Sequence, residues 1–312
     1  MHMARVEIAK NAIKLDHLII PIELIQEARK QKLPVVVPER DALRMPCMLD
    51  LPDFTDQPDD YQKGLATFCR EYQSVIAPLV SIAIPTYNNP IQFEKTLQSA
   101  LAQDYPNLEI IVGDDSTNNA TAAVIEPYLA EHQHLRYINN HGPLGEMGDK
   151  NARNILSKCY GDFINLLFHD DLIFPTKISK QVEILLRDSE EELAFVIARR
   201  NWINDNGEVL REPEIRDTTP YSVINARAFG KNYFQTFANQ LGEVSFTLVR
   251  RTSNFGKKYP YGEFCGVPEA AMFDISSWLD LGRRQNFAIN NEVLGSFRLS
   301  GGGNKPSIQF AI

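Results

Sequence analysis

Residues 80–90 read Val-Ser-Ile-Ala-Ile-Pro-Thr-Tyr-Asn-Asn-Pro, an apolar run followed by small polar residues. The run from Val80 to Pro85 is typical of a short strand that is buried on both faces. Asn88-Asn89-Pro90 then predicts the start of a helix that continues to about Gln103, because proline is favoured in the first helical turn. A strand, a polar turn and a helix in this order form the beginning of an α/β unit.

The same alternation continues toward the C-terminus. Further buried strands are predicted at 108–112, 135–138, 162–168 and 193–198. Helices are predicted between these strands at 120–131, 146–159 and 175–187. Strands that alternate with helices are joined by right-handed crossovers, which place successive strands parallel in one sheet. The sequence therefore predicts an α/β fold with a mostly parallel sheet flanked by helices.

The composition changes before this regular pattern begins. Between Pro46 and Asp60, prolines alternate with aspartates, which is typical of an exposed connector. We therefore predict an N-terminal extension and linker over residues 1–79, and a main domain over residues 80–312.

The overall composition is that of a globular protein. The 312 residues are 44% hydrophobic and 23% charged, so the chain can bury a sizeable core. Its formal net charge is -8, whereas nucleic-acid binding requires a basic surface. The composition therefore argues against a nucleic-acid partner.

Cysteine spacing and hydropathy argue against a zinc site, a disulfide framework and a transmembrane segment. The four cysteines are scattered and contain no CxxC pair, so neither a zinc site nor a disulfide framework is predicted. No apolar stretch reaches the roughly 18 residues that span a bilayer, and the first residues lack the pattern of a signal peptide. We therefore expect no transmembrane segment and a cytoplasmic location, and we leave open peripheral contact with the inner face of the membrane.

Polar clusters follow three of the predicted strands. These clusters are Thr86-Tyr87-Asn88, Asp114-Asp115 and His169-Asp170-Asp171. In open parallel sheets, ligands bind beyond the carboxyl ends of the strands. We therefore expect the three clusters to meet at one binding site.

The Asp170-Asp171 doublet has two interpretations. Aspartates in such a place can cap a helix or close a turn. Adjacent carboxylates on a sharp turn can also form a hard oxygen site for Mg2+ or Mn2+, completed by phosphates and water. An ion there would neutralise the charge that develops on a diphosphate leaving group. His169 could either join the ligands of Mn2+ or lie outside them.

Three other polar residues also allow two interpretations each. Asp114 and Asp115 can cap the following helix, or accept a hydrogen bond from a nucleobase or ribose while Tyr87 covers the base. Arg153 lies early in its helix, where it can reach a phosphate or remain on a solvated face.

The order and spacing of these segments resemble the nucleotide-sugar-binding half of family-2 glycosyltransferases. Residues 80–88 are similar to the family's VSIxIPTYN stretch, and residues 114–117 are similar to its DDxS. Residues 152–154 match ARN, and residues 161–167 match GDFIxxL. The metal motif, usually DxD, follows at once, with Phe168 where the first aspartate is common.

This resemblance implies the GT-A fold, with a Rossmann-like sheet, and a set of site residues. The residues implied to bind the nucleotide sugar are Pro85, Thr86, Tyr87, Asn88, Asp114, Asp115, Arg153, Asp170 and Arg298. Those implied to bind the metal are Asp170, Asp171 and His169. Within the main domain, the resemblance assigns residues 80–175 to the donor, and residues 176–312 to the acceptor and a C-terminal lid.

A weaker resemblance covers the C-terminal half. Residues 243–251 resemble the strand beside the acceptor pocket, and residues 274–281 resemble a helix written DxxxWLxL. Asp274 would then be the general base; Glu269 is a rival base, and a helix-start aspartate favoured by the helix dipole is the alternative. Residues 297–300 resemble a terminal YRxH, with Ser300 in place of the histidine. Arg298 is expected to approach phosphate there.

We therefore expect a glycosyltransferase of polysaccharide biosynthesis. It would move a sugar from a nucleotide-diphosphate donor, UDP by family habit, to an acceptor hydroxyl with inversion, assisted by Mg2+ or Mn2+. The acceptor would be a saccharide, a lipid-linked molecule or a protein.

Two other hypotheses belong to different classes. A nucleotide-sugar-binding or scaffold protein without turnover would explain the departures at Phe168 and Ser300. A sugar nucleotidyltransferase ranks last, because residues 85–90 contain no glycine-rich, basic phosphate loop.

Overall fold

The structure is a computed structural model of the 312-residue chain. It describes residues 6–9, 12–15, 35–36, 77–188, 191–236, 241–251, 263–264, 267–268, 273–282 and 285–299. The chain divides into two compact units, residues 1–77 and 78–312. In the first unit, β1 (Val6–Ala9) pairs antiparallel with β2 (Ala12–Leu15), and β3 (Val35–Val36) pairs parallel with β2.

The second unit begins with the predicted alternation of strands and helices. In chain order, its first elements are β4 (Val80–Thr86), α3 (Pro90–Leu101), β5 (Leu108–Asp114), α4 (Ala120–Glu131), β6 (Leu135–Asn139), η3 (Glu146–Gly148), α5 (Asp149–Leu156), β7 (Phe163–Leu166), β8 (Leu172–Ile173) and α6 (Lys177–Arg187). The strands β4, β5 and β7 are buried along almost their whole length, as the apolar runs predict.

The remaining elements add more strands than helices. In chain order they are β9 (Leu193–Ile203), β10 (Val209–Arg211), β11 (Tyr221–Ile224), α7 (Ala226–Thr236), η4 (Val244–Phe246), β12 (Thr247–Arg250), β13 (Glu263–Phe264), β14 (Val267–Pro268), α8 (Phe273–Gly282) and β15 (Asn286–Arg298). The short strands β13 and β14 pair with each other in a separate two-stranded sheet.

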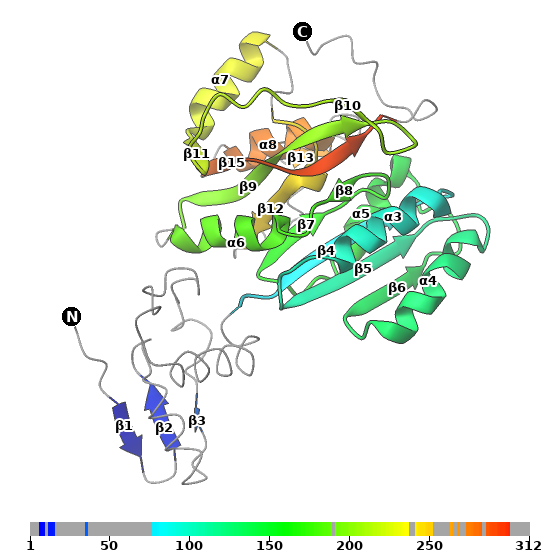
Figure 1. The fold of residues 1–312 in the computed structure, drawn as a ribbon, viewed down its shortest axis with the longest axis horizontal. Coiled ribbons are helices and arrows are strands. Elements are labelled where there is room, and N and C mark those ends of the chain that lie inside the picture. The colour runs from blue at the N-terminus through cyan, green and yellow to red at the C-terminus, as the bar shows by residue number, and fades with distance from the viewer. Residues whose placement is uncertain are drawn as a thin grey trace. The chain divides into compact units, whose positions relative to one another are not determined.

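Among the described residues, the other strands of the second unit form one ten-stranded sheet (Figure 1). Its order is β11-β15-β9-β12-β7-β4-β5-β6, with β10 on β9 and β8 on β15. The strands β7, β4, β5 and β6 are all parallel. The order reverses at β4, because β5 and β6 continue on one side while the later β7 lies on the other. Such a reversal creates a crevice beyond the carboxyl ends of the strands.

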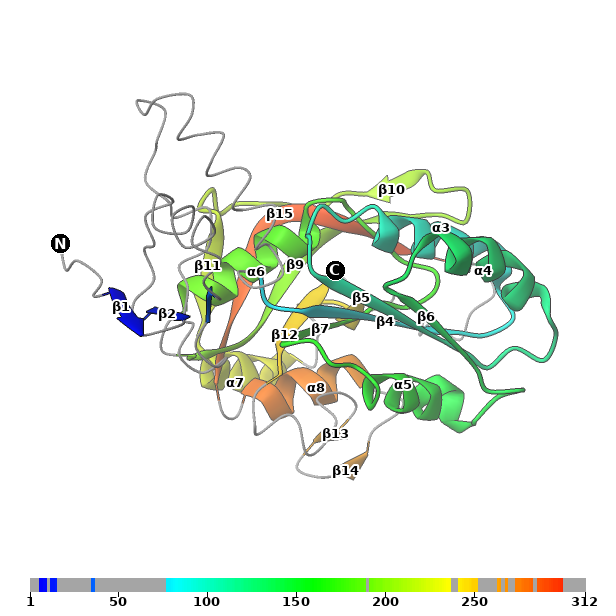
Figure 2. The ribbon, with the colours of Figure 1, turned by 90° about the horizontal axis from the view of Figure 1, so that it is seen from below.

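Helices cover both faces of this sheet (Figure 2). The helices α3, α4 and α6 lie on one face, and α5, α7 and α8 lie on the other. On the second face, Phe195 stacks on Phe287 and contacts Trp278 of α8, with ring centroids 4.8 Å apart in both pairs. The apolar cores on the two faces hold the strand ends, and therefore the loops that follow them, in fixed places.

The structure confirms the α/β fold, the mostly parallel sheet and the flanking helices. Several boundaries differ from the prediction by a few residues, among them the following three. β7 ends at Leu166, so residues 167–171 form a turn rather than the end of a strand. The helix predicted at 146–159 begins as η3, with Met147 at a positive φ of 52°, and continues as α5. β9 extends to Ile203, because it pairs with β15 as far as that residue.

One antiparallel strand interrupts the parallel order. β12 pairs antiparallel with β7 on one side and with β9 on the other. The segment that enters β12 therefore lies at the same edge of the sheet as the carboxyl end of β7. No helix in the part of the chain that the structure describes is long and apolar enough to cross a membrane.

Candidate functional site

The ends of β4 and β5 are joined by hydrogen bonds. The Asp115 amide donates to the Thr86 carbonyl at 3.0 Å, and the Asn88 amide donates to the Ser116 hydroxyl at 2.9 Å. Asn88 has a positive φ of 46°, a conformation that asparagine tolerates better than most residues. The Thr86 hydroxyl is buried and has no hydrogen-bond partner among the described residues. Tyr87 is 47% exposed, so its ring is accessible at this edge.

Asp114 and Asp115 are both buried and hold the surrounding loops. Asp114 accepts hydrogen bonds from the Ser116 amide at 2.8 Å and the Tyr137 hydroxyl at 2.7 Å. Burial and the Asp114 carboxylate together raise the pKa of Tyr137 well above its ordinary value. Asp115 accepts hydrogen bonds from the Asn140 side chain at 2.8 Å and the Leu144 amide at 3.1 Å. These contacts fix both carboxylates at the end of β5.

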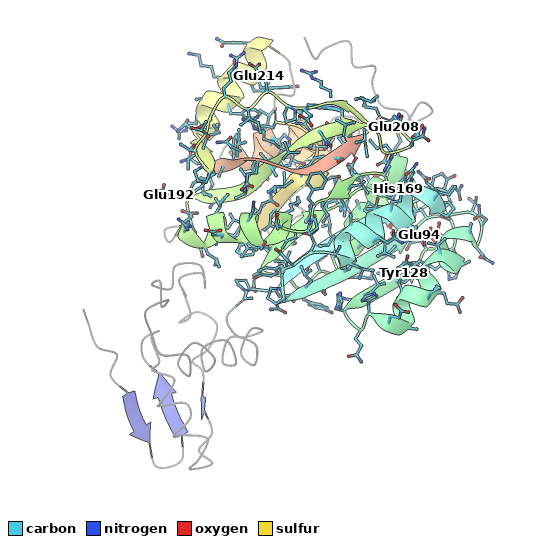
Figure 3. All side chains as sticks on the ribbon, in the orientation of Figure 1. Glu94, Tyr128, His169, Glu192, Glu208 and Glu214 are labelled. Carbon is cyan, nitrogen blue, oxygen red and sulfur yellow. The ribbon has the colours of Figure 1, made fainter. Side chains whose placement is uncertain are left out.

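The turn after β7 lies against the end of β4. The imidazole of His169 (Figure 3) accepts a hydrogen bond through Nδ1 from the Tyr87 amide at 3.3 Å. This contact brings the first and third polar clusters of the sequence together. The hydrogen bond from the Asp115 amide to the Thr86 carbonyl adds the second cluster, so the strand-end clusters meet as expected.

Asp171 faces the interior of the protein. It is 1% exposed, and its carboxylate accepts hydrogen bonds from the Ser245 hydroxyl at 2.6 Å and the Arg298 amide at 3.1 Å. The Thr96 hydroxyl donates to the Asp171 carbonyl at 2.8 Å. Asp171 therefore ties the turn to η4, β15 and α3.

Asp170 is only partly buried and is held through its backbone. Arg298 donates through Nε to the Asp170 carbonyl at 2.9 Å, and through a terminal nitrogen to the carbonyls of Asn204 at 2.7 Å and Asp205 at 3.1 Å. Arg298 is fully buried, and burial lowers its pKa against the opposing charges of Asp170, Asp171 and Asp205. In this structure Arg298 supports the turn that carries Asp170, and its contact with phosphate stays a prediction.

The described residues contain no group of three His, Cys, Asp or Glu side chains that could hold a metal ion. A cation in this corner would therefore need oxygens from outside the protein to complete its shell. On α5, Arg153 donates through Nε to Asp149 at 2.6 Å, so its guanidinium is oriented by its own helix.

Asp274 lies in the first turn of α8 and next to the segment that enters β12. Its carboxylate accepts a hydrogen bond from the Val244 amide at 3.4 Å. Burial and the charge of Glu243 raise the pKa of Asp274 to about 7, while the Val244 amide and Arg200 act in the opposite direction. A carboxyl with this pKa can accept a proton near neutral pH. Glu269, the rival base, lies outside the described residues.

Two neighbouring residues connect Asp274 with the acidic turn. Val244 contacts Asp274, and the next residue, Ser245, contacts Asp171 and accepts a hydrogen bond from the Phe168 amide at 3.1 Å. The prediction missed Ser245, Glu243 and Arg200. A polar residue between apolar neighbours, as in Val244-Ser245-Phe246, was the available signal for Ser245.

The reversal of strand order at β4, the acidic loops after β5 and β7, and the helix-start aspartate together define a protein of the GT-A class. The sequence model described as "Glycosyl transferase family 2" matches residues 81–255, more than half of the chain. The chain therefore belongs to glycosyl transferase family 2.

Curated relatives agree with this membership. The GalNAc(5)-diNAcBac-PP-undecaprenol beta-1,3-glucosyltransferase of Campylobacter jejuni is 31% identical over 214 residues, covering 68% of this chain and 62% of the relative. An uncharacterized glycosyltransferase of Rickettsia prowazekii is 36% identical over 125 residues, covering 39% of this chain and 37% of the relative. The chain thus spans less than two thirds of the length of each of these relatives.

A solved structure shares the fold. Staphylococcus aureus TarS 1-349, in complex with UDP-GlcNAc, superposes with a TM-score of 0.54 at 17% sequence identity. The match covers 72% of this chain and 59% of TarS 1-349.

Proposed function

We propose that this protein transfers a sugar from a nucleotide-diphosphate donor to an acceptor hydroxyl, with inversion at the anomeric carbon. The observation that carries the proposal is the link from Asp274 through Val244 and Ser245 to the acidic turn at Asp170-Asp171. This link connects Asp274, whose carboxyl is suited to proton removal, with the turn that carries Asp170, whose carboxyl is suited to work on the diphosphate.

The donor binds at the strand ends. Tyr87 covers the base, and the buried hydroxyl of Thr86 offers a hydrogen bond that no described residue uses. Asp114 and Asp115 shape the loops around the nucleoside, and each carboxylate oxygen retains a second lone pair for it. UDP is the proposed nucleotide, supported by the UDP-GlcNAc bound to TarS and by family habit.

The Asp170 carboxylate would hold a divalent cation, Mg2+ or Mn2+, beside the donor's diphosphate. When bound, the ion supplies neutralising charge for the departing diphosphate. Asp171 acts here as an internal support, because both of its carboxylate oxygens accept hydrogen bonds from protein donors.

The Asp274 carboxylate removes the proton from the acceptor hydroxyl as that oxygen attacks the anomeric carbon. The new carbon–oxygen bond forms while the bond to the diphosphate breaks, and the diphosphate leaves with the electron pair. Attack from the face opposite the leaving group inverts the anomeric centre, so no covalent enzyme intermediate is needed. The acceptor is a saccharide, a lipid-linked molecule or a protein, and the Campylobacter relative's name supports the lipid-linked class.

The proposal is tested with a panel of nucleotide sugars. A true donor should raise the melting temperature, since a ligand bound only by the folded state stabilises that state. With this donor and an acceptor, Asp274→Asn should lower kcat at least about 100-fold while leaving donor stabilisation unchanged. Full turnover by this variant would remove Asp274 from the mechanism. Donor binding with neither transfer nor hydrolysis by the native protein would favour a binding protein instead.

A further inference from the structure

Residues 241–247, here named the bridging segment, are held by side chains from several other elements. At its C-terminal end, Asn165 of β7 donates to the carbonyls of Ser245 at 3.0 Å and Thr247 at 2.7 Å. Gln181 of α6 donates to the Phe246 carbonyl at 2.8 Å, and the buried Lys177 donates to the Thr247 carbonyl at 3.3 Å. These contacts fix the half of the segment that touches the acidic turn.

The N-terminal end of the bridging segment is fixed by Arg200. Arg200 donates through Nε and a terminal nitrogen to the two carboxylate oxygens of Glu243, at 2.7 and 3.3 Å. It also donates to the Leu241 carbonyl at 3.4 Å. Both side chains of the pair are largely buried, at 12% and 17% exposure. A bidentate arginine–carboxylate pair fixes orientation as well as distance.

The surroundings of Arg200 leave little room for movement. Its guanidinium carbon lies 4.7 Å from the centre of the Trp202 ring. A Cβ at Gly242 would lie 2.4 Å from the same carbon, and Gly242 has a positive φ of 110°. Trp278 donates to the Gly242 carbonyl at 3.1 Å. Glycine at 242 is therefore required both by the backbone and by the closeness of the arginine.

Within the described ranges, few other charged groups lie on the elements that pack against α8. Glu243 and Arg200 act on Asp274 from outside its helix. Asp280 lies further along α8, and α7, which packs against α8, carries Arg227 and Lys231. The strand β13 also packs against α8 and carries Glu263, whose side chain lies outside the described set.

We propose that Arg200 and Glu243 are positioning residues for the reaction: their ion pair holds the bridging segment so that the Val244 amide meets Asp274. This inference rests on the proposed function, in which Asp274 is the base. The pair acts on Asp274 through the backbone and the local charge. Without the pair, the Val244 amide would no longer be held against Asp274. Asp274 would also lose the nearby charges that shift its pKa.

The first test needs no substrate. Because the pKa of Asp274 is raised in the folded protein, its contribution to stability falls as the pH rises above the ordinary aspartate range and levels off near pH 7. We call the pH at which this contribution stops changing the levelling point. It is measured as the difference in unfolding free energy between the native chain and Asp274→Asn, followed against pH. In a Glu243→Gln background, the levelling point should move down by about one pH unit, because the charge of Glu243 acts on the pKa of Asp274 more strongly than the opposing Val244 hydrogen bond.

The matched control is Glu214→Gln. Glu214 pairs with Arg216 at 2.9 Å, but the pair is 73% and 82% exposed, so it should leave the levelling point unchanged. Should Glu243→Gln fail to fold, Arg200→Lys provides the second arm. Lysine keeps the charge but loses the two-pronged contact, so Glu243 is less neutralised and the levelling point should rise.

The second readout is kinetic. In donor turnover, the acid limb of kcat/KM should move in the same direction as the levelling point, while KM for the donor stays within about twofold. A Glu243→Gln protein that loses stability but keeps both pH values would overturn the proposal, since the pair would then be only structural. A shifted levelling point in the Glu243→Gln variant, together with a native protein that transfers no sugar, would uphold the positioning of Asp274 and refute the proposed function.

Discussion

At the scale of single residues, the adjacent aspartates Asp170 and Asp171 have different surroundings. The carboxylate of Asp171 is buried and accepts two hydrogen bonds from protein groups, whereas Asp170 is partly exposed and held through its carbonyl. Sequence alone could place both at the end of a strand. It could not divide their roles, because the donors to Asp171 come from residues 245 and 298, far away in the chain.

This difference predicts opposite phenotypes for two matched substitutions. Asp170→Asn should weaken Mn2+-dependent stabilisation by the donor at least about tenfold in affinity, with little change in the melting temperature of the apoprotein. Asp171→Asn should lower the unfolding free energy by about 1–3 kcal/mol, since it disturbs buried hydrogen bonds. Thermal melts with and without donor and Mn2+ compare the two. Equal effects of the two substitutions on donor binding would contradict this division of roles.

Asp274 gives a prediction for pH dependence. Because burial and Glu243 raise its pKa to about 7, the carboxyl is mostly protonated below that pH and cannot accept a proton. The rate of transfer should therefore rise about tenfold per pH unit below pH 7 and level off above it. A pH profile of kcat/KM, corrected for donor ionisation, measures this limb. A limb near pH 4 would mean that the base is a carboxyl with an ordinary pKa, which contradicts the raised pKa of Asp274.

At the scale of elements, the sequence predicted the strands and helices of the donor half closely. Helix α4, predicted at 120–131, begins and ends at those residues. Such agreement follows from local signals, namely apolar periodicity and turn residues. The place of β12 between β7 and β9 could not be predicted in this way, because strand order depends on long-range packing. The same holds for the contacts of Arg200 and Ser245.

Helix α6 contains a buried lysine that should respond to pH. Burial lowers the pKa of Lys177 well below its ordinary value, so the folded state favours the neutral amine. The unfolded chain then binds more protons below the ordinary lysine pKa, and stability must rise with pH in that range. The stability of the native chain relative to Lys177→Met should therefore increase toward pH 10, by up to about 1.4 kcal/mol per pH unit. Urea unfolding at several pH values measures this slope. A flat difference would show that Lys177 is charged in the folded state.

At the scale of the whole molecule, the second unit contains every described residue of the proposed site. Residues 78–312 include the whole ten-stranded sheet and the helices on both of its faces. A protein consisting of residues 78–312 should therefore fold and show the same melting-temperature increase with the donor as the full chain, within about 2 °C. Calorimetry of the two proteins makes the comparison. Loss of the donor response in the shorter protein would give residues 1–77 a part in the site.

The position of β12 also governs how synthesis of the chain relates to its solubility. A nascent chain that has not yet reached residue 247 has already made β7 and β9, the two strands between which β12 inserts. Until then, the facing edges of both strands offer unpaired backbone groups, which are templates for aggregation. Chains arrested before this point should accumulate as insoluble material or depend on chaperones. The sheet is completed only when β15 has also been made, so the sheet and the catalytic centre are both assembled late in synthesis.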